Sequence, residues 1–326
     1  MRIAVITGIS GQDGAYLAKL LLSKGYKVIG IVRNLNQRFV GLEYLGIEKD
    51  ITLELCDLWE QASILRLLNK YKPDEIYNLA AQSSVGLSFE YPTETIKFNF
   101  TSVLNFLEVI RQHNPAIKFY QASSSEMYGK VVNLPIKVDS PMHPLSPYAI
   151  SKASGFWTVI NYREAFGLHC CTGILFNHES YLRSPNFFVK KVIGEAIKMT
   201  RQPDLMLKLG NLNVKRDFGY SPKYVEAMWL MLQRPKAKDF IICSGTSILL
   251  KDIVSYIFDK LGLAMNRVIT GDELLRPTDI ENIYGDKDDA INDLGWDYDL
   301  NFFQVLDILI EEEIENNPEG NAGTTR

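Results

Sequence analysis

The segment Thr7-Gly8-Ile9-Ser10-Gly11-Gln12-Asp13-Gly14 decides the fold, because its three regularly spaced glycines directly follow an apolar run at residues 2–7. Glycines allow backbone N–H groups to approach a pyrophosphate closely, and a following helix adds the favourable end of its dipole. A strand, this turn and a helix in that order predict a dinucleotide-binding unit. The competing interpretation is a tight turn that binds nothing. The predicted cofactor residues of the turn are Gly8, Gly11, Gln12, Asp13 and Gly14.

The first half of the chain alternates short β-branched runs with longer amphipathic segments, as in a parallel sheet flanked by helices. Predicted strands cover residues 2–7, 27–32, 52–55, 75–79, 118–122 and 170–175. Predicted helices cover residues 14–23, 61–70, 92–112 and 147–166. This order predicts an α/β class protein with a doubly wound, Rossmann-like parallel sheet.

After residue 175 the alternation weakens. A helix pattern at residues 187–200 is followed by strand-like pieces at 205–209 and 240–244. We therefore predict a cofactor-binding domain at residues 1–175 and a smaller C-terminal, mainly substrate-binding lobe at residues 176–326, with some segments returning to the first domain.

Composition excludes several classes of partner. A formal net charge of −4 gives no reason to expect binding to nucleic acid or to a membrane surface, which would favour a basic patch. Apolar runs end well short of the roughly 20 residues that span a bilayer, so we predict a cytoplasmic protein. Metal-ligand spacing is absent among the cysteines, and we expect no metal and interpret them as reduced packing residues. They are Cys56, Cys170, Cys171 and Cys243.

The end of the second predicted strand indicates which dinucleotide is bound. An acidic residue there favours NAD, whereas an arginine accommodates the 2′-phosphate of NADP. The strand ends in Val32-Arg33-Asn34, and residues 14–42 contain no Asp or Glu, so we predict NADP. The alternative is that Arg33 and Arg38 are solvated loop charges. Further cofactor contacts are predicted where the third and fourth strands end, at Asp57, Leu58, Leu79, Ala81, Gln82 and Ser83.

Tyr148 and Lys152 are four residues apart in the helix that Ser146-Pro147 begins, so they share one face. A phenol with a pKa of about 10 is a poor base near neutral pH unless a nearby positive charge lowers that pKa. We expect Lys152 to supply this charge. The spacing is common by chance, and it gains weight here from its position behind the dinucleotide turn and before a strand.

The fifth predicted strand ends in Gln121-Ala-Ser-Ser-Ser125-Glu126-Met-Tyr-Gly129, at the edge where open α/β sheets bind ligands. A simple alcohol dehydrogenase needs a hydroxyl there to orient its substrate, but it has no evident use for the carboxylate of Glu126. Glu126 therefore suggests a second proton transfer. The alternative is that Glu126 caps a turn or pairs with a surface lysine.

These motifs resemble the GDP-mannose 4,6-dehydratase family, within the extended short-chain dehydrogenases, over nearly the whole chain. The later segments are more diagnostic than the glycine turn or the tyrosine–lysine pair, which many relatives share. The resemblance implies NADP as cofactor, a GDP-sugar substrate such as GDP-mannose, and a homodimer or dimer of dimers. The segments that carry it are residues 7–14, 78–83, 121–129, 176–180, 209–217 and 224–233.

The chemistry that the resemblance implies is an internal redox cycle without net oxidation. Tyr148 removes the C4 hydroxyl proton while the C4 hydride passes to NADP, and the resulting 4-keto group acidifies the C5 proton. Glu126 takes that proton, and Ser124 with Glu126 assists the loss of the C6 hydroxyl as water. Return of the hydride to C6 gives the 4-keto-6-deoxy sugar. The implied catalytic residues are Ser124, Glu126, Tyr148 and Lys152.

The resemblance also implies contacts for the rest of both ligands. His178 and Arg183 match cofactor positions, although a lone histidine at a strand end is more often structural. Each of the substrate-site cations is individually as consistent with a surface charge, but together they would form an anion site. The implied substrate-binding residues are Ser83, Ser124, Asn177, Asn186, Lys191, Arg216, Arg276 and Asp279.

Several residues depart from the family pattern. Ser124 stands where threonine is usual, which preserves the hydroxyl, while Ser84 and Glu94 replace a histidine and a tyrosine near the cofactor. The segment Tyr181-Leu-Arg-Ser-Pro185 and Asp279, where glutamate is usual, lie where the sugar would bind. A related hexose or GDP-manno-heptose is therefore an alternative substrate.

Two further readings of the chain remain open. A nucleotide-sugar 4-reductase or epimerase would use Tyr148 and Lys152 without needing Glu126, and a catalytically silent protein would bind cofactor alone. The segment after Arg33 lacks the serine-rich, doubly basic loop that helps family dimers pair. Dimer and tetramer therefore both remain open, with the helices at residues 92–112 and 147–166 as the expected dimer contact.

Overall fold

Within residues 1–271 and 277–316, which the computed structural model describes, the chain forms a seven-stranded parallel sheet. The strand order is β10-β6-β5-β4-β1-β2-β3. The order reverses direction at β1, so the predicted doubly wound fold is confirmed. In chain order the strands are β1 (Ile3–Thr7), β2 (Lys27–Val32), β3 (Thr52–Leu55), β4 (Glu75–Asn78), β5 (Lys118–Ser124), β6 (Cys170–Leu175) and β10 (Phe240–Ile242).

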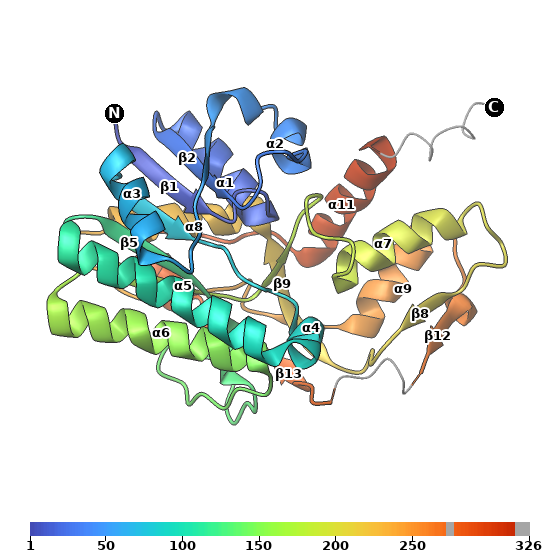
Figure 1. Ribbon diagram of the computed structural model, residues 1–326. Helices are drawn as coiled ribbons and strands as arrows, with labels where there is room; N and C mark the ends of the chain where they lie inside the picture. The colour runs from blue at the N-terminus through green and yellow to red at the C-terminus, as the bar shows by residue number, and fades with distance from the viewer. Residues whose placement is uncertain (272–276, 317–326) are drawn as a thin grey trace.

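Helices cover both faces of this sheet (Figure 1). One face packs against α1 (Gln12–Ser23) and α8 (Ser221–Gln233). The other face packs against α3 (Gln61–Tyr71), α5 (Pro92–His113) and α6 (Pro147–Phe166). The sheet is therefore the middle of three layers, with its strand ends left open for a ligand. Shorter helices lie in the connections, at α2 (Val40–Tyr44), α4 (Val85–Glu90) and α10 (Asp288–Asn292).

A smaller lobe forms beside the main sheet, on the right in Figure 1. Its core lies between α7 (Phe188–Met199), α9 (Leu250–Lys260) and α11 (Phe302–Asn316). Here β9 (Lys215–Tyr220) pairs with β7 (Asn177–Glu179), β11 (Ser247–Leu249) and β13 (Asn282–Ile283). Separately, β8 (Leu207–Leu209) pairs with β12 (Val268–Thr270).

The structure places β10 in the main sheet beside β6, although its sequence was grouped with the C-terminal pieces. The helix α8 likewise packs against α1. We therefore propose that the chain is divided near residue 175, with α8 and β10 returning to the cofactor-binding part.

Element boundaries differ from the predictions where side chains or caps change the backbone. Gly11 is the extended residue that precedes α1, so the helix begins at Gln12 and not at Gly14. The fourth strand ends at Asn78 because the Leu79 N–H turns to donate to Thr7 Oγ1 at 3.0 Å. The fifth strand is longer than predicted and carries Ser124 within the sheet.

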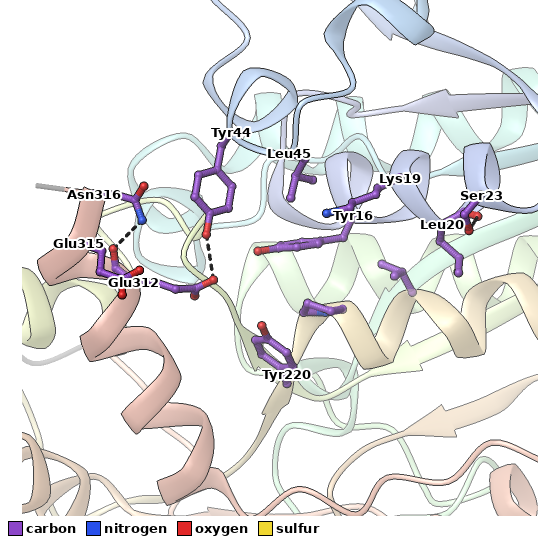
Figure 2. A pocket seen from close by; sticks show the side chains of 12 residues that line it. Tyr16, Lys19, Leu20, Ser23, Tyr44, Leu45, Tyr220, Glu312, Glu315 and Asn316 are labelled. Carbon is purple, nitrogen blue, oxygen red and sulfur yellow. Dashed lines mark hydrogen bonds between the residues drawn. The ribbon is translucent and has the colours of Figure 1, made fainter.

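The end of α11 returns to the outer side of α1 and the start of α8, where a cavity of about 690 Å³ opens (Figure 2). The rings of Tyr16, Tyr44 and Tyr220 border it, and the Tyr44 hydroxyl donates to Glu312 Oε1 at 2.9 Å. None of the helices in the described part of the chain is long and apolar enough to cross a membrane.

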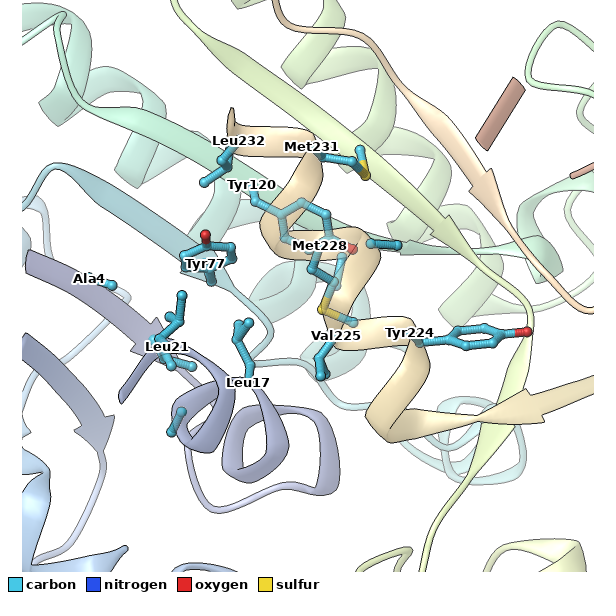
Figure 3. Close-up of a cluster of buried hydrophobic side chains, with 14 of the residues drawn as sticks. Ala4, Leu17, Leu21, Tyr77, Tyr120, Tyr224, Val225, Met228, Met231 and Leu232 are labelled. Atoms are coloured by element: carbon cyan, nitrogen blue, oxygen red, sulfur yellow. The ribbon is translucent and has the colours of Figure 1, made fainter. Parts of the chain in front are cut away.

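The contact between α1 and α8 closes one side of the main core (Figure 3). Leu17 and Leu21 of α1 lie against Val225 and Met228 of α8, and each of these side chains is at most 2% exposed. Burying one such side chain stabilises the fold by roughly 1.5–3 kcal/mol. This packing holds the first turn of α1, and therefore the glycine turn, against the sheet.

We predict that Gly14→Ala lowers the free energy of unfolding by about 1–3 kcal/mol. A Cβ atom at Gly14 would lie 2.3 Å from Gly8 O and 2.7 Å from Ile9 Cα, and these backbone atoms have no rotamer by which to move away. Gly194→Ala in α7 is the matched control. A Cβ atom there meets nothing within 4 Å, so the helix should gain roughly 0.5–1 kcal/mol. Urea unfolding measures both, and an unchanged midpoint for Gly14→Ala would contradict the close approach.

Candidate active site

The start of α6 positions the tyrosine–lysine pair. Ser146 caps the helix by accepting a hydrogen bond from Ala149 N at 3.0 Å, and Pro147 occupies the first turn. Tyr148 and Lys152 then fall on one face and both line a cavity of about 430 Å³. Both are buried, at 8% and 7% exposure, so their charges depend on protein groups more than on water.

The cavity lies where β4, β5 and β6 end and where β7 and β9 begin the smaller lobe. The structure brings all four predicted catalytic residues together there. The sequence prediction missed other lining residues, chiefly Glu179 and Phe187. The predicted residues that line the cavity are Asp13, Leu79, Ala81, Ser83, Ser124, Glu126, Tyr148, Lys152, Asn177, His178, Arg183, Asn186, Arg216 and Asp279.

Lys152 lies near the Tyr148 ring, and its expected effect on the pKa of the phenol stays a prediction. Lys152 Nζ donates to Ala122 O at 2.9 Å and lies 5.7 Å from the centre of the Tyr148 ring. Burial raises the pKa of Tyr148 to about 12, a hydrogen bond with Ser124 opposes this, and the Glu126 charge adds to it. Burial also lowers the pKa of Lys152 to about 8. Desolvation is therefore the largest influence on the pKa of the Tyr148 phenol.

Ser124 connects the other catalytic groups. Its hydroxyl accepts from Glu126 N at 3.3 Å and also forms the hydrogen bond with Tyr148. The short 3₁₀ helix Ser125–Tyr128 begins there, and it ends at Gly129, whose φ is +52°. A Cβ atom at Gly129 would lie 1.8 Å from His143 O, so this turn requires glycine. The turn fixes Glu126 beside the phenol.

The glycine turn has the shape that a dinucleotide needs. Gly8 has φ of +70°, and a Cβ atom there would lie 3.0 Å from Ala80 N. The Gly11 N–H donates to Gly8 O, which closes the turn at the N-terminus of α1. Among the described residues, Gln82 Nε2 and Arg183 Nε are buried without a hydrogen-bond partner. A backbone cradle with unmatched donors nearby fits a pyrophosphate cofactor.

The side chains that follow this turn are already paired. Gln12 donates to His178 O at 2.9 Å and accepts from Ser180 Oγ at 2.8 Å. Asp13 contacts His178 Nε2 at 2.9 Å and accepts from Ser221 Oγ at 2.7 Å. These contacts join α1 to β7 and α8. The predicted contacts of the Gln12, Asp13 and His178 side chains with a cofactor therefore stay predictions.

Asp13 and His178 stabilise each other's charged forms. Burial opposes both charges, yet the facing histidine holds the pKa of Asp13 below its ordinary value. Against the same burial penalty, Asp13 raises the pKa of His178. The histidine is further fixed by its Nδ1, 2.7 Å from Phe176 O, and by stacking on Tyr224. It is a structurally satisfied residue.

Two arginines, Arg183 and Arg216, line another part of the cavity, here called the cationic wall. Arg216 of β9 is 6% exposed and donates to Asp279 Oδ1 and to Ile280 O, both at 2.5 Å. Arg183 Nε lies 3.6 Å from Glu179 Oε1, and its guanidinium carbon lies 3.6 Å from the centre of the Phe187 ring. Both guanidinium groups are thus held in place before any ligand arrives.

Glu179 could have been found from the sequence, because it adjoins His178 in a segment that the family resemblance includes. Its side chain is 3% exposed, and burial raises its pKa against the opposing charge of Arg183.

Some predicted residues lie away from the cavity. Arg33 and Asp57 are exposed, and Asp57 Oδ1 accepts from Trp59 N at 2.9 Å. Lys191 Nζ donates to Lys208 O at 2.9 Å. Arg276 lies outside the described residues. The predicted residues that the structure describes but that do not line the cavity are Gly8, Gly11, Gln12, Gly14, Arg33, Asp57, Leu58, Gln82 and Lys191.

The larger cavity in Figure 2 contains none of the predicted site residues, and α1 contributes Tyr16, Lys19, Leu20 and Ser23 to its lining. We assign the site to the smaller cavity because catalysis requires an acid, a base and a hydroxyl within reach of one ligand.

Comparisons with known proteins identify the relatives of this chain. The family model described as GDP-mannose 4,6 dehydratase matches residues 5–309. GDP-mannose 4,6 dehydratase 1 of Arabidopsis thaliana is 41% identical, with 96% of this chain and 90% of the relative covered. The Homo sapiens relative is 37% identical, with 96% and 91% covered. The Vibrio cholerae relative is 35% identical, with 96% and 94% covered.

Solved structures support the fold. UDP-glucose 4-epimerase of Thermotoga maritima superposes with a TM-score of 0.87 at 20% identity, covering 96% of this chain and 99% of that one. A dTDP-glucose 4,6-dehydratase of Bacillus anthracis gives 0.84 at 18% identity, with 98% of each chain covered. The sequence relatives decide the family, and the chain belongs to the GDP-mannose 4,6-dehydratase family.

Proposed function

We propose that this protein is a GDP-mannose 4,6-dehydratase, which converts GDP-mannose to GDP-4-keto-6-deoxymannose and water. The observation that carries the proposal is the position of Glu126 in the same cavity as Tyr148 and Lys152, with Ser124 between them. A 4-reductase or an epimerase would need the tyrosine and lysine but not this carboxylate. The names of the sequence relatives support the same activity.

The cofactor that we propose is NADP, held at its pyrophosphate by the glycine turn and at its 2′-phosphate by Arg33. When bound, its nicotinamide would accept the C4 hydride of the sugar and return it to C6. One solved structure of this fold, RMD from Pseudomonas aeruginosa, contains NADPH, whereas the B. anthracis enzyme contains NAD. The lack of an acidic residue between Asp13 and Glu43 supports NADP here.

The chain's own residues would carry the proton transfers. Tyr148 in its phenolate form, which the buried ammonium of Lys152 would stabilise, accepts the C4 hydroxyl proton. The Glu126 carboxylate accepts the C5 proton and passes it to the departing C6 hydroxyl, which leaves as water. When the hydride returns to C6, C5 takes up one proton, which balances the proton that Tyr148 removed from the C4 hydroxyl. The Ser124 hydroxyl, already bonded to the tyrosine, orients the substrate for both transfers.

GDP-manno-heptose is a second candidate substrate. Asp279 lines the cavity and pairs with Arg216, and it is one methylene shorter than the usual glutamate. A shorter side chain at this wall leaves more room for a larger sugar. Comparing kcat/KM for the two GDP-sugars distinguishes the candidates.

We further propose a cytoplasmic homodimer, or a dimer of dimers, formed through α5 and α6. The exposed surface of α6 carries Ile150, Trp157 and Phe166, which are 43%, 58% and 48% exposed. Ile150 and Trp157 are seven residues apart and share one face of α6, whereas Phe166 lies on another face. Large exposed apolar side chains on one face of a helix support burial against a second copy. Sedimentation velocity of the wild type and of Trp157→Glu tests this contact.

We predict that Glu126→Gln slows the loss of water from GDP-mannose by at least about 100-fold, because the amide cannot accept the C5 proton. Mass spectrometry of the product after incubation with NADP measures the change. NADP affinity should stay at the wild-type value, since the substitution preserves shape. Glu311→Gln, on an exposed turn of α11, is the control and should react normally. Water loss at the wild-type rate in Glu126→Gln would refute the dehydratase assignment.

For the cofactor, we predict that Arg33→Ala weakens NADP binding about tenfold and leaves NAD binding unchanged. The reason is that the 2′-phosphate, which only NADP carries, loses its cationic partner. Calorimetric titration with each dinucleotide measures the difference. Arg38→Ala is the matched control, because Arg38 already pairs with Glu43 at 2.6 Å and should contribute less. Equal losses for both dinucleotides would speak against Arg33 as the selective residue.

The buried ammonium of Lys152 gives a pH-dependent stability. Its pKa is about 8 in the folded chain against an ordinary value of 10.5, so between these values the unfolded chain binds more protons. Folding stability should therefore rise with pH across this window, by roughly 3 kcal/mol relative to Lys152→Met. Urea unfolding of both proteins on either side of the window measures the difference. Parallel pH curves would contradict the shifted pKa.

A further inference from the structure

The segment at residues 278–286, here called the strap, contributes Asp279 to the lining of the cavity. At one end Thr278 Oγ1 donates to Leu145 O at 2.7 Å, directly before the cap of α6. At the other end Ile136 N donates to Tyr284 O at 2.9 Å, and Asp286 N donates to Ile136 O at 2.8 Å. The strap therefore contacts the connection that leads into the helix of Tyr148.

Between these two ends the strap pairs with β9. Its strand β13 lies parallel to β9, with Asn282 opposite Lys215 and Ile283 opposite Arg216. The Arg216 side chain holds the beginning of the strap through Asp279 and Ile280. The position of the cationic wall thus depends on how the strap sits against β9.

Asp217, the next residue of β9, holds the end of the strap. Its Oδ2 accepts from Gly285 N at 3.3 Å. Side chains alternate along a strand, so Arg216 and Asp217 point to opposite faces. Arg216 lines the cavity and Asp217 does not. Arg216 and Asp217, which are consecutive in β9, therefore hold the beginning and the end of the strap.

The same carboxylate also holds the loop that follows β10. Asp217 Oδ1 accepts from Ser244 N at 2.8 Å and from Ser244 Oγ at 2.7 Å, and Oδ2 accepts from Gly245 N at 3.0 Å. Asp217 is fully buried. An ionised carboxylate has acceptor sites for all these donors, whereas an amide does not.

The strap packs closely against β10 where Asp217 holds it. A Cβ atom at Gly285 would lie 2.7 Å from Ile241 Cγ2 and 2.8 Å from Cys243 Sγ. The strap has no space in which to shift inward, so its position is set by the hydrogen bonds of Asp217 and Arg216 together.

We propose that Asp217 is a positioning residue for the substrate pocket. By holding the strap and the loop after β10 on β9, it keeps Arg216 and Asp279 aligned opposite Tyr148. This inference rests on the proposed function in one respect, namely that the Arg216 wall receives the diphosphate of the GDP-sugar.

The variant Asp217→Asn tests the inference in the full-length chain. We expect the KM for GDP-mannose and the calorimetric Kd for GDP to rise about tenfold, because the amide directs N–H groups at the backbone donors. We expect kcat to stay within about threefold of the wild-type value and the Kd for NADP to stay unchanged. The reason is that neither the proposed catalytic residues nor the glycine turn takes part in the hydrogen bonds of Asp217.

The control is Asp239→Asn. Asp239 is another buried aspartate, which accepts from Thr172 N at 2.7 Å and pairs with Arg163 at the start of β10, the end far from Ser244. This variant should lose comparable thermal stability without a change in KM or in GDP binding. A purely structural role for Asp217 predicts that the two variants behave alike, and that result would overturn the inference.

Failure of the two proposals is distinguishable. If the wild type binds GDP but does not turn over GDP-mannose, the proposed function fails, and the change in GDP affinity alone decides the role of Asp217. If the wild type does not bind GDP, the inference fails as well. If Asp217→Asn does not fold, Ser244→Ala removes one donor and keeps the carboxylate, and should weaken GDP binding by about two- to threefold. Unchanged GDP binding in Ser244→Ala would then overturn it.

Discussion

A buried hydrogen-bond relay at the C-terminal edge of the sheet fixes the geometry on which the site depends. Thr7 Oγ1 donates to Asn78 Oδ1 at 2.7 Å, and Asn78 Nδ2 donates to Gln121 Oε1 at 2.8 Å. Gln121 Nε2 and Lys152 Nζ then both donate to Ala122 O, at 2.8 and 2.9 Å. Buried polar groups are costly without partners, so the relay allows little sliding of β1, β4, β5 and α6 past one another. The glycine turn directly follows Thr7 at one end of this relay, and Lys152 lies at its other end.

Burial at this edge also sets the resting charges of the site. The protein interior penalises both a phenolate and an ammonium, which is why the pKa of Tyr148 is raised while that of Lys152 is lowered. At neutral pH the phenol is therefore protonated and the lysine is charged. Tyr148 must lose its own proton before it can act as a base, and the resulting phenolate would meet a cation that is already present and already desolvated. Burial disfavours each of these charges alone, but the same low-dielectric surroundings strengthen the attraction between the Tyr148 phenolate and the Lys152 ammonium.

The sequence predicted best those features that depend on buried strands and on their order. The strands at residues 27–32, 52–55 and 170–175 agree with the prediction to the residue. For 27–32 and 170–175 the reason is that strands buried on both faces appear as continuous apolar runs, whereas the partly exposed 52–55 alternates apolar and polar residues. The position of Ser124 and Glu126 at the ligand edge followed from the rule that parallel strands end at one edge, whereas Tyr148 was singled out by its spacing from Lys152. The prediction that some C-terminal segments return to the first domain did not identify which ones, because β10 has only three residues and its place in the main sheet depends on pairing with β6. Burial, which local spacing does not reveal, raises the pKa of Tyr148. The pairing of Asp13 with His178 likewise arises from the packing of β7 against α1.

The smaller lobe is attached to the main sheet by several chain crossings, and this limits how the site can close. The chain enters the lobe at β7, returns from β9 into α8, and enters again after β10 at β11. The β7–β9 and β11–β9 ladders join strands that lead directly into or out of the main sheet. Both ladders lie within the lobe, so a rigid rotation of the lobe would have to break its contacts with α1, which Gln12 and Asp13 make with His178. These buried contacts oppose a hinged movement of the whole lobe. Selection of a ligand then depends on the volume and charge at individual positions of the cavity, where Asp279 pairs with Arg216 and Glu179 lies beside Arg183.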